Sequence, residues 1–465
     1  MSSVKFAKYV QSSKRCHLIG IGGVSMSPLA IILHNTGIEV SGSDINDSTV
    51  IKELRDLGIT VYIGHHADNI VGAGYIVRTA AARDDNVEVE AAQKNNIPVF
   101  ERAEAWGHIM RSYKDALCIS GVHGKTTTTS MVSRILLAAG TDPTVMIGGT
   151  LPKIESGCLV GKGDIIVLEA CEYYNSFHNF HPTVALILNI DADHLDFFKD
   201  LDGLKSSFRH FASLVPKNGY IICNGDDENT MDALTKLDRE LITFGFNEFA
   251  AVTGKPIRLR GTNVKTSGRH PSMDISFDGN HVCSIKLRIP GVHNLKNALA
   301  AAAACLYIGI SPKIIEDELL EYSGVGRRFE YKGSYNGADV FDDYAHHPRE
   351  LSALIDAVST FDCYNRFIIA FQPHTYSRTR ALFDDFVSEL KRPDVVFLSD
   401  IYAAREQPID GVSSQILADA VPESVCISDF GKMTEQIAAI ARKGDIVITV
   451  GAGDIYKVGE SLVSR

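Results

Sequence analysis

A glycine-rich loop with a single lysine contains the residue types that nucleotide phosphates need. Residues 116–120 form an apolar run, residues 121–129 read GVHGKTTTT, and a helical apolar pattern follows at residues 131–139. A glycine turn that opens a helix directs backbone N–H groups and the helix dipole at phosphate oxygens. Lys125 would then neutralise the β- and γ-phosphates, and the Thr126 hydroxyl would bind Mg²⁺.

The spacing of this loop departs from the ordinary phosphate-loop pattern. That pattern would place its first glycine at Ile119, whereas the first glycine here is Gly121. A tight turn with a surface lysine is the alternative interpretation. The order of strand, Gly-Lys-Thr and helix nevertheless favours phosphate binding, because a phosphate site requires that order.

Two acidic segments follow apolar runs farther along the chain. They are residues 169–173, which read EACEY, and residues 189–196, which read NIDADHLD. In open α/β sheets, ligands bind at the carboxyl ends of the strands. Carboxylate and imidazole groups there suit Mg²⁺ that bridges a nucleotide and a substrate. A solvated loop of ordinary charges is the alternative for either segment alone.

A second glycine turn lies near the N-terminus. Residues 16–27 read CHLIGIGGVSMS, and Asp44 follows at the distance that suits a ribose hydroxyl in a dinucleotide fold. Ser25 replaces the third glycine of that fingerprint, which argues against NAD. The diphosphate of another nucleotide could bind the same helix N-terminus. Glycines required only for a tight turn remain the other interpretation.

The elements that position these residues are typical of an α/β protein. Short β-branched runs alternate with helical patterns, which is typical of parallel sheets covered by helices. The eight clearest runs are residues 16–21, 75–79, 116–120, 165–169, 184–189, 367–371, 395–399 and 446–450. They fall into three sets, and the GVGRR segment at residues 324–328 resembles a hinge. We predict domains at residues 1–112, 113–325 and 326–465.

Composition limits the classes of function. The chain has 465 residues, of which 45% are hydrophobic and 22% charged, and its net charge is −11. A negative chain repels polyanions, so we expect no nucleic-acid partner. The apolar stretch at residues 298–310 is too short to span a membrane, and residues 1–20 lack the apolar core of a signal peptide. Nine scattered cysteines predict reduced, structural thiols in a cytoplasmic protein.

Six segments together resemble the Mur ligase family over nearly the whole chain. They are GVHGKTTTT, EACEY, NIDADHLD, GVHNLKNA at residues 291–298, GRRF at residues 326–329 and DDYAHHP at residues 342–348. The resemblance implies three domains: a Rossmann-like N-terminal domain that binds a UDP-sugar, a central P-loop-type ATPase domain and a C-terminal Rossmann-like α/β domain.

The resemblance also implies roles for single residues. Lys125, Arg327 and His194 would act in catalysis, Thr126, Glu172 and His194 would hold Mg²⁺, and Arg378 and Arg380 would contact substrate. The ATP-binding set would be Gly121, Val122, His123, Gly124, Lys125, Thr126, Thr127, Asn294, Arg327 and Asp343. The UDP-sugar would contact Gly22, Gly23, Val24, Ser25, Asp44, His65 and Thr79. The arginine common in the family is replaced by Thr375, which limits what the QPHTYSR segment at residues 372–378 can imply.

Within the family, the first glycine segment, SGSD at residues 41–44 and IYAARE at residues 401–406 are most similar to members that add L-alanine to UDP-N-acetylmuramate. The implied reaction is ATP-dependent amide formation through an acyl phosphate, with ATP and Mg²⁺ as cofactors. The alternatives are a ligase for a recycled murein peptide, a folylpolyglutamate ligase, an NAD-dependent oxidoreductase and a nucleotide-sensing regulator.

Overall fold

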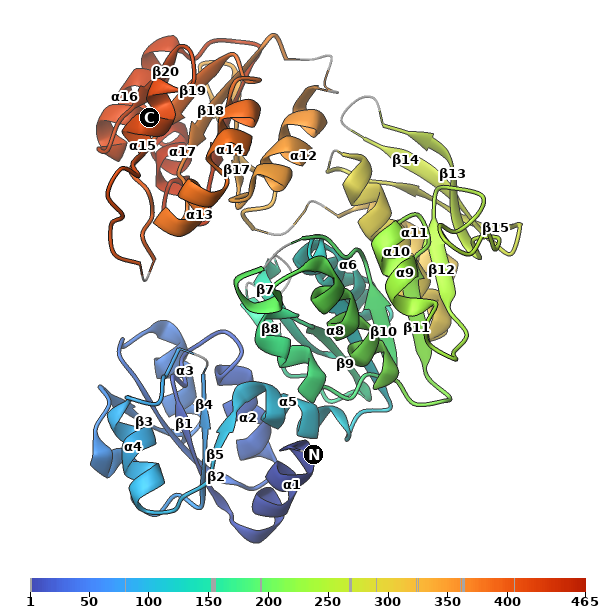
Figure 1. Cartoon of the computed structure of the whole chain (residues 1–465), viewed down its shortest axis with the longest axis vertical. Coiled ribbons are helices and arrows are strands. Elements are labelled where there is room, and N and C mark those ends of the chain that lie inside the picture. The colour runs from blue at the N-terminus through green and yellow to red at the C-terminus, as the bar shows by residue number, and fades with distance from the viewer. Residues whose placement is uncertain are drawn as a thin grey trace. The chain divides into compact units, whose positions relative to one another are not determined.

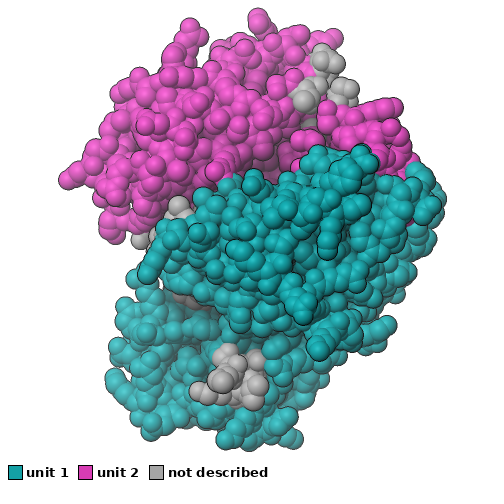
Figure 2. All heavy atoms as spheres, turned by 45° about the vertical axis from the view of Figure 1, so that its right-hand side comes forward, with its two compact units in different colours: residues 1–260, 276–281, 299–315 teal, residues 261–275, 282–298, 316–465 magenta. Residues whose placement is uncertain are grey.

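The computed structural model describes residues 2–79, 81–151, 156–192, 195–266, 270–289, 291–322, 324, 326–359, 361, 364–404 and 406–465. They form three sheets with their helices (Figure 1). The chain divides into two compact units (Figure 2). The first unit comprises residues 1–260, 276–281 and 299–315, and the second comprises residues 261–275, 282–298 and 316–465.

The first sheet is entirely parallel and has the order β3-β2-β1-β4-β5. This order is that of a dinucleotide-binding fold. Its strands are β1 (Arg15–Ile19), β2 (Glu39–Asp44), β3 (Thr60–Ile63), β4 (Tyr75–Arg78) and β5 (Val99–Glu101). The accompanying helices are α1 (Ser2–Ser12), α2 (Ser27–Asn35), α3 (Thr49–Asp56), η1 (Ala67–Ile70), α4 (Val87–Lys94) and α5 (Arg102–Met110).

Helices cover both faces of this sheet because its strands are apolar on both sides. Leu18 and Val77 pack on one face with Leu29 of α2, whereas Ile76 packs on the other face with Val89 of α4. Parallel sheets are stable when both faces are buried. A ligand can therefore reach the sheet mainly at the ends of its strands.

The middle sheet carries the lysine loop and has the order β15-β14-β13-β12-β11-β10-β6-β9-β7-β8. The strands from β13 through β7 pair in parallel, and β8 is antiparallel at the edge. The strands are β6 (Asp115–Ser120), β7 (Thr144–Leu151), β8 (Ser156–Leu159), β9 (Ile165–Glu169), β10 (Val184–Ile187), β11 (Tyr220–Asn224), β12 (Ile242–Gly245), β13 (Leu259–Lys265), β14 (Ser272–Phe277) and β15 (Asn280–Lys286). The helices are α6 (Lys125–Ala138), η2 (Tyr173–Asn179), α7 (Leu195–Phe198), α8 (Leu201–Ser213), α9 (Glu228–Leu234), α10 (Val292–Tyr307) and α11 (Pro312–Leu320).

The third sheet has the order β16-β17-β21-β18-β19-β20, with only β16 antiparallel. Its strands are β16 (Glu330–Tyr335), β17 (Ala338–Asp343), β18 (Arg366–Phe371), β19 (Val395–Leu398), β20 (Ser424–Cys426) and β21 (Asp445–Val450). Its helices are α12 (Pro348–Ser359), α13 (Tyr376–Ala381), α14 (Phe383–Leu390), α15 (Ser414–Asp419), α16 (Phe430–Ile440) and α17 (Tyr456–Val463). All six residues of β21 are buried, because helices pack on both of its faces.

The predicted α/β class with three sheets is confirmed, and all eight predicted runs are strands. The alanine-rich stretch near residue 300 forms the buried core of α10. Within the described part of the chain, no helix combines the length and apolar character that crossing a membrane requires. The eight predicted runs correspond to β1, β4, β6, β9, β10, β18, β19 and β21, and the other strands, among them β13, β14 and β15, were not predicted.

Candidate functional site

The register of the middle sheet gathers three predicted segments at one edge. Ser120 pairs with Ile187 on one side of β6, and Ile119 pairs with Glu169 on the other side. The lysine loop, the EACEY segment and the NIDADHLD segment therefore all continue from neighbouring strand ends. This is the edge at which open α/β sheets bind ligands.

Glycine is required at two positions of the lysine loop. Gly121 has a φ of +138°, and a Cβ there would lie 2.9 Å from Cβ of Leu188 and 3.1 Å from the backbone nitrogen of Asn189. Gly124, with a φ of 83°, is the residue before α6. The chain can therefore turn sharply from β6 into α6. The first turn of α6 then presents backbone N–H groups that have no partner within the helix.

Asn189 fixes the first half of the loop. Its Oδ1 accepts from the backbone N–H of His123 at 2.8 Å, and its Nδ2 donates to the His123 carbonyl at 3.0 Å. The N–H of Val122 donates to the Asn189 carbonyl at 3.3 Å. The backbone amides of Val122 and His123 therefore already donate to Asn189. Of the backbone amides predicted to contact phosphate in this loop, we expect those of residues 124–127 to make the contacts.

Lys125 forms an ion pair with the carboxylate of Glu172. Its Nζ is 3.0 Å from Oε2 and 3.2 Å from Oε1 of Glu172, and it also donates to the Gly121 carbonyl at 2.6 Å. Burial disfavours the charged ammonium, but the carboxylates of Glu172 and Glu169 outweigh burial and raise the pKa of Lys125. The lysine is therefore charged at neutral pH and close to the N-terminus of α6.

Hydroxyl and carboxylate oxygen atoms lie near this lysine. The Thr126 hydroxyl donates to Glu169 at 3.2 Å, and the other oxygen of Glu169 accepts from the Gly148 amide at 2.7 Å. Hydroxyl and carboxylate oxygens are the donors that Mg²⁺ prefers. Among the described residues no group of three or more His, Cys, Asp or Glu side chains is arranged to hold a metal ion. His194 lies outside the described residues.

Strained backbone follows Glu172. Tyr174 and Asn175 have φ values of 53° and 54°, in the left-handed region that side chains other than glycine avoid. Asn175 donates its backbone N–H to the Glu172 carbonyl at 2.8 Å, and the Ser207 hydroxyl donates to the Asn175 side chain at 2.5 Å. Such strain persists where surrounding contacts enforce it, and it is common at functional sites.

The first glycine turn lies at the corresponding edge of the first sheet. Gly22 donates its N–H to Oδ2 of Asp44 at 2.9 Å, so the predicted acid is brought to the turn and braces it. Oγ of Ser25 is buried and has no hydrogen-bond partner among the described residues. Thr79 follows β4, and its methyl carbon would lie 2.6 Å from a Cβ at Gly20. The exposed Gly23 and Val24 complete the turn.

His65 follows β3 at this edge, next to the glycine turn. Its Nδ1 lies 3.0 Å from Oγ of Ser43 and 3.1 Å from Oε2 of Glu88. The backbone carbonyl of Ser43 accepts from Gly20 and Ile21. Ser43 thus links the histidine to the glycine turn.

Arg327 belongs to the second unit, where it is held from several sides. Its Nε donates to Asp342 at 3.0 Å and its Nη2 to the Gly451 carbonyl at 2.5 Å. The guanidinium also lies 4.9 Å and 4.7 Å from the ring centres of Tyr344 and Tyr456. The backbone of Arg327 has a φ of 61°. The side chain is therefore oriented by contacts within the second unit.

Asp343 is buried beside this arginine. Its two oxygens accept from the backbone N–H groups of Phe329 and Ala345, each at 2.8 Å. Burial raises the pKa of Asp343 to about 6, although Arg328 and the two backbone donors favour the charged form. Asp343 can therefore gain a proton in mildly acidic solution.

Arg378 and Arg380 lie on α13, and Asn294 lies in the first turn of α10. An Nη atom of Arg378 lies 2.9 Å from Nδ1 of His374. Burial, together with the nearby His346 and Arg378, lowers the pKa of His374 to about 4, so the neutral ring accepts this hydrogen bond. Arg380 is exposed, and Asn294 is buried.

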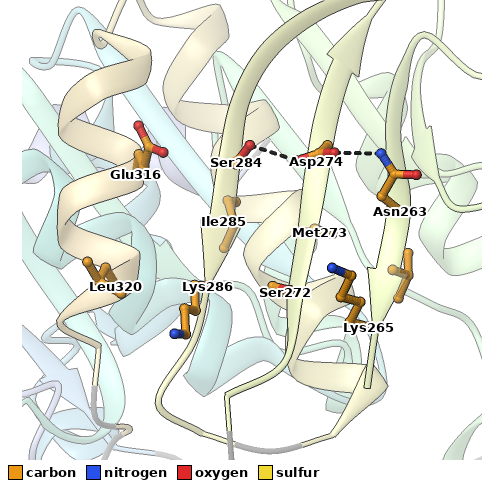
Figure 3. Close-up of a pocket in the computed structure, with 11 residues that line it drawn as sticks. Asn263, Lys265, Ser272, Met273, Asp274, Ser284, Ile285, Lys286, Glu316 and Leu320 are labelled. Carbon is orange, nitrogen blue, oxygen red and sulfur yellow. Dashed lines mark hydrogen bonds between the residues drawn. The ribbon is translucent and has the colours of Figure 1, made fainter. Parts of the chain in front are cut away.

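A cavity of about 620 Å³ lies in the second unit, over β13, β14, β15 and α11 (Figure 3). Lys265 and Lys286 line one part of it, and Asp274 and Glu316 line another. Asn263 and Ser284 each donate to Asp274 at 2.6 Å. This cavity contains none of the predicted site residues, so the candidate site is defined by the strand ends instead.

Comparisons with known proteins agree along the whole chain. Residues 15–114 match the model described as Mur ligase family, catalytic domain, residues 119–305 match the Mur ligase middle domain, and residues 327–453 match the Mur ligase glutamate ligase domain. The UDP-N-acetylmuramate–L-alanine ligase of Caldanaerobacter subterraneus is 43% identical over 98% of both chains. The ligase of the same name from Acetivibrio thermocellus is 44% identical over 96% of this chain and 95% of its own.

Solved structures give the same result. The UDP-N-acetylmuramate–alanine ligase MurC of Thermotoga maritima matches with a TM-score of 0.78 and 27% identity, over 97% of this chain and 98% of its own. A murein peptide ligase of Psychrobacter arcticus shares the fold, with a TM-score of 0.69 and 22% identity over 97% and 98% of the two chains. The residues matched by the family models include the lysine loop and the first glycine turn. Together with the third model match and the full-length identity to the ligases above, they show that the chain belongs to the Mur ligase family.

Proposed function

We propose that this chain is the ligase that joins L-alanine to UDP-N-acetylmuramate, with ATP converted to ADP and phosphate. The proposal rests mainly on the position of Lys125. This lysine pairs with Glu172 at the start of a helix, beside the ends of three parallel strands. The near full-length identity to L-alanine ligases supports the choice of substrates.

The chemistry follows from the poor reactivity of a carboxylate. An oxygen of the muramate carboxylate attacks the γ-phosphorus of ATP, the bond to the bridging oxygen breaks, and ADP leaves with both electrons. The resulting acyl phosphate is electrophilic at carbon. The neutral amine of alanine attacks that carbon, and the tetrahedral intermediate expels phosphate while the nitrogen loses a proton. Charge that develops on the transferring phosphoryl group must be stabilised by fixed cations and donors.

The middle domain supplies those groups in this proposal. Lys125 and the amides of residues 124–127 bind the phosphates, while Thr126, Glu172 and His194 would hold Mg²⁺. When bound, Mg²⁺ would neutralise phosphate charge. Because Asn189 and the strained turn after Glu172 fix the loop and the carboxylate, these groups need little rearrangement before the reaction.

The other two domains supply the remaining contacts. We propose that the UDP-sugar binds Gly22, Gly23, Val24, Ser25, Asp44, His65 and Thr79. We assign Asn294 and Asp343 to the nucleoside of ATP, Arg327 to its phosphates, and Arg378 and Arg380 to substrate. The domains would span residues 1–112, 113–325 and 326–465, each with one of the three sheets at its core. Since ATP and sugar nucleotides are cytoplasmic metabolites, we place the reaction in the cytoplasm.

The direct test is ADP formation by the purified chain with ATP, Mg²⁺, UDP-N-acetylmuramate and single amino acids. We expect ADP release that requires both the sugar nucleotide and an amino acid, with L-alanine the best acceptor. A requirement for a tripeptide in place of alanine would identify a murein peptide ligase. Tight binding of NADH without ADP formation would overturn the proposal in favour of an oxidoreductase.

Glu172→Gln should raise the Mg²⁺ concentration for half-maximal rate by about tenfold or more, because it removes a charged oxygen ligand. The substitution keeps the size of the side chain and removes its charge. The matched control is Asp232→Asn, which removes a carboxylate of the same domain that pairs with Lys205 at 3.1 Å. We expect the control to leave the Mg²⁺ titration unchanged. An unchanged titration of Glu172→Gln would remove Glu172 from the metal site. His194→Ala should behave as Glu172→Gln does.

A further inference from the structure

A buried carboxylate lies beneath the predicted UDP-sugar contacts of the first domain. Glu88, near the start of α4, has 0% of its side chain exposed. Its Oε2 accepts from the Ser43 hydroxyl at 2.6 Å and from Nδ1 of His65 at 3.1 Å. Its Oε1 accepts from Asn69 at 2.7 Å and from the His66 amide at 3.4 Å. A buried charge is tolerated only when it is satisfied in this way.

The carboxylate of Glu88 is ionised throughout the neutral range. Burial alone would raise its pKa, but hydrogen bonds and the nearby ring of His17 outweigh burial and lower the pKa of Glu88 to about 2. Nε2 of His17 is 3.7 Å from Oε1 of Glu88, which is too far for a hydrogen bond. No lysine or arginine pairs with Glu88 among the described residues.

An ionised carboxylate can only accept hydrogen bonds, which fixes the proton on His65. Nδ1 of His65 must carry hydrogen in order to contact Oε2 of Glu88 at 3.1 Å. The ring is 19% exposed, and its Nδ1 edge faces the fully buried carboxylate. The open part of the ring is therefore the side that carries Nε2. Ser43 ties the same ring to the glycine turn through its own backbone carbonyl.

We propose that Glu88 is a positioning residue, which holds the His65 ring with Nδ1–H inward so that Nε2 meets the diphosphate or adjoining sugar of the bound nucleotide. This inference rests on the proposed function, since the ligand is the UDP-sugar. A carboxylate that orients a histidine through Nδ1–H fixes the tautomer and direction of the other ring nitrogen. Glu88 itself does not touch the ligand.

The test is a double-substitution cycle on the Kd of UDP-N-acetylmuramate, measured by calorimetry without ATP. We expect Glu88→Gln and His65→Asn each to raise Kd by roughly tenfold. An increase of this size corresponds to the loss of one hydrogen bond to a charged group. The double variant should bind no more weakly than His65→Asn alone, because Glu88 acts through that ring. For Glu88→Gln, which does not touch the ligand, the loss should appear in the KM for the sugar nucleotide and not in kcat.

The matched control is Asp445→Asn, which removes a carboxylate with 1% exposure that pairs with Arg366 in the third domain. It should lower thermal stability without changing the Kd of the sugar nucleotide. Full additivity of the Glu88 and His65 effects would overturn the inference, and so would an unchanged Kd in Glu88→Gln. If the unsubstituted chain fails to bind the sugar nucleotide, the proposed function itself is wrong.

A second measurement does not depend on the folding of a Glu88 variant. Nuclear magnetic resonance of ring nitrogens, with His65 assigned by the signals that His65→Asn removes, reports which nitrogen carries hydrogen. We expect Nδ1 to be protonated in the free chain. An unprotonated Nδ1 would overturn the inference, because an ionised Glu88 could not then accept from that atom.

Discussion

Lys125→Ala should abolish ADP formation, with kcat lowered by about 10³-fold or more, because a fixed cation at the transferring phosphoryl group is lost. The substitution also breaks the ion pair between Lys125 and Glu172, which is 1% exposed. Removal of one partner of a buried ion pair costs about 3–5 kcal/mol, so part of the effect could come from destabilisation. Thermal unfolding of the variant, followed by circular dichroism, measures that part.

The matched control for Lys125 is Lys205→Ala. Lys205 is 13% exposed, compared with 17% for Lys125, and it pairs with Asp232 at 3.1 Å in the same domain. We expect it to turn over ATP normally. The double variant Lys125→Met with Glu172→Gln removes both charges, and we expect it to restore stability while remaining inactive. Near-normal ADP formation by folded Lys125→Ala would refute the phosphate site.

Arg327→Ala should lower kcat by about 10³-fold while the Kd for ATP changes by only a few-fold, the pattern of a cation that acts on developing phosphoryl charge. The structure sharpens this prediction, because Arg327 is already oriented by Asp342, Gly451 and two tyrosine rings. These contacts hold the guanidinium within its own domain. Steady-state kinetics together with calorimetric ATP binding separate the two quantities.

A control must account for the buried ion pair that Arg327→Ala breaks. Arg366→Ala breaks a comparable pair in the same domain, since Arg366 lies 2.6 Å from the buried Asp445. If Arg366→Ala lowers kcat as strongly, the Arg327 effect is structural. If Arg327→Ala instead raises the KM for ATP with kcat unchanged, the arginine is a ground-state anchor and not a catalytic cation.

Local sequence patterns were sufficient to predict which segments lie at the strand ends that form the site. The lysine loop, both acidic segments and the first glycine turn lie at strand ends because apolar runs bounded by glycine or acid specify parallel strands. Asp44 was predicted as a ligand contact, and its hydrogen bond to the backbone of the first turn was not predicted. Strands such as β14 and β16 lack that signal, because they are only partly buried.

Side-chain contacts between distant segments could not be predicted from local sequence. Ser43 and Glu88 are 45 positions apart, and Ser207 is 32 positions from Asn175. The left-handed backbone of Tyr174 could not be predicted either, because no glycine marks it in the sequence. The hydrogen bond between Asn189 and the lysine loop was not predicted. Asn189 lies in a segment that was singled out for its acidic residues, and nothing in the sequence pointed to its side-chain amide.

The ion pair between Lys125 and Glu172 would couple the loading of nucleotide and metal in the proposed site. Phosphate oxygens would compete with Glu172 for the ammonium of Lys125. A divalent cation that arrived with the nucleotide would then supply a countercharge to the buried carboxylate. We therefore expect the metal complex of ATP to bind more tightly than ATP without metal.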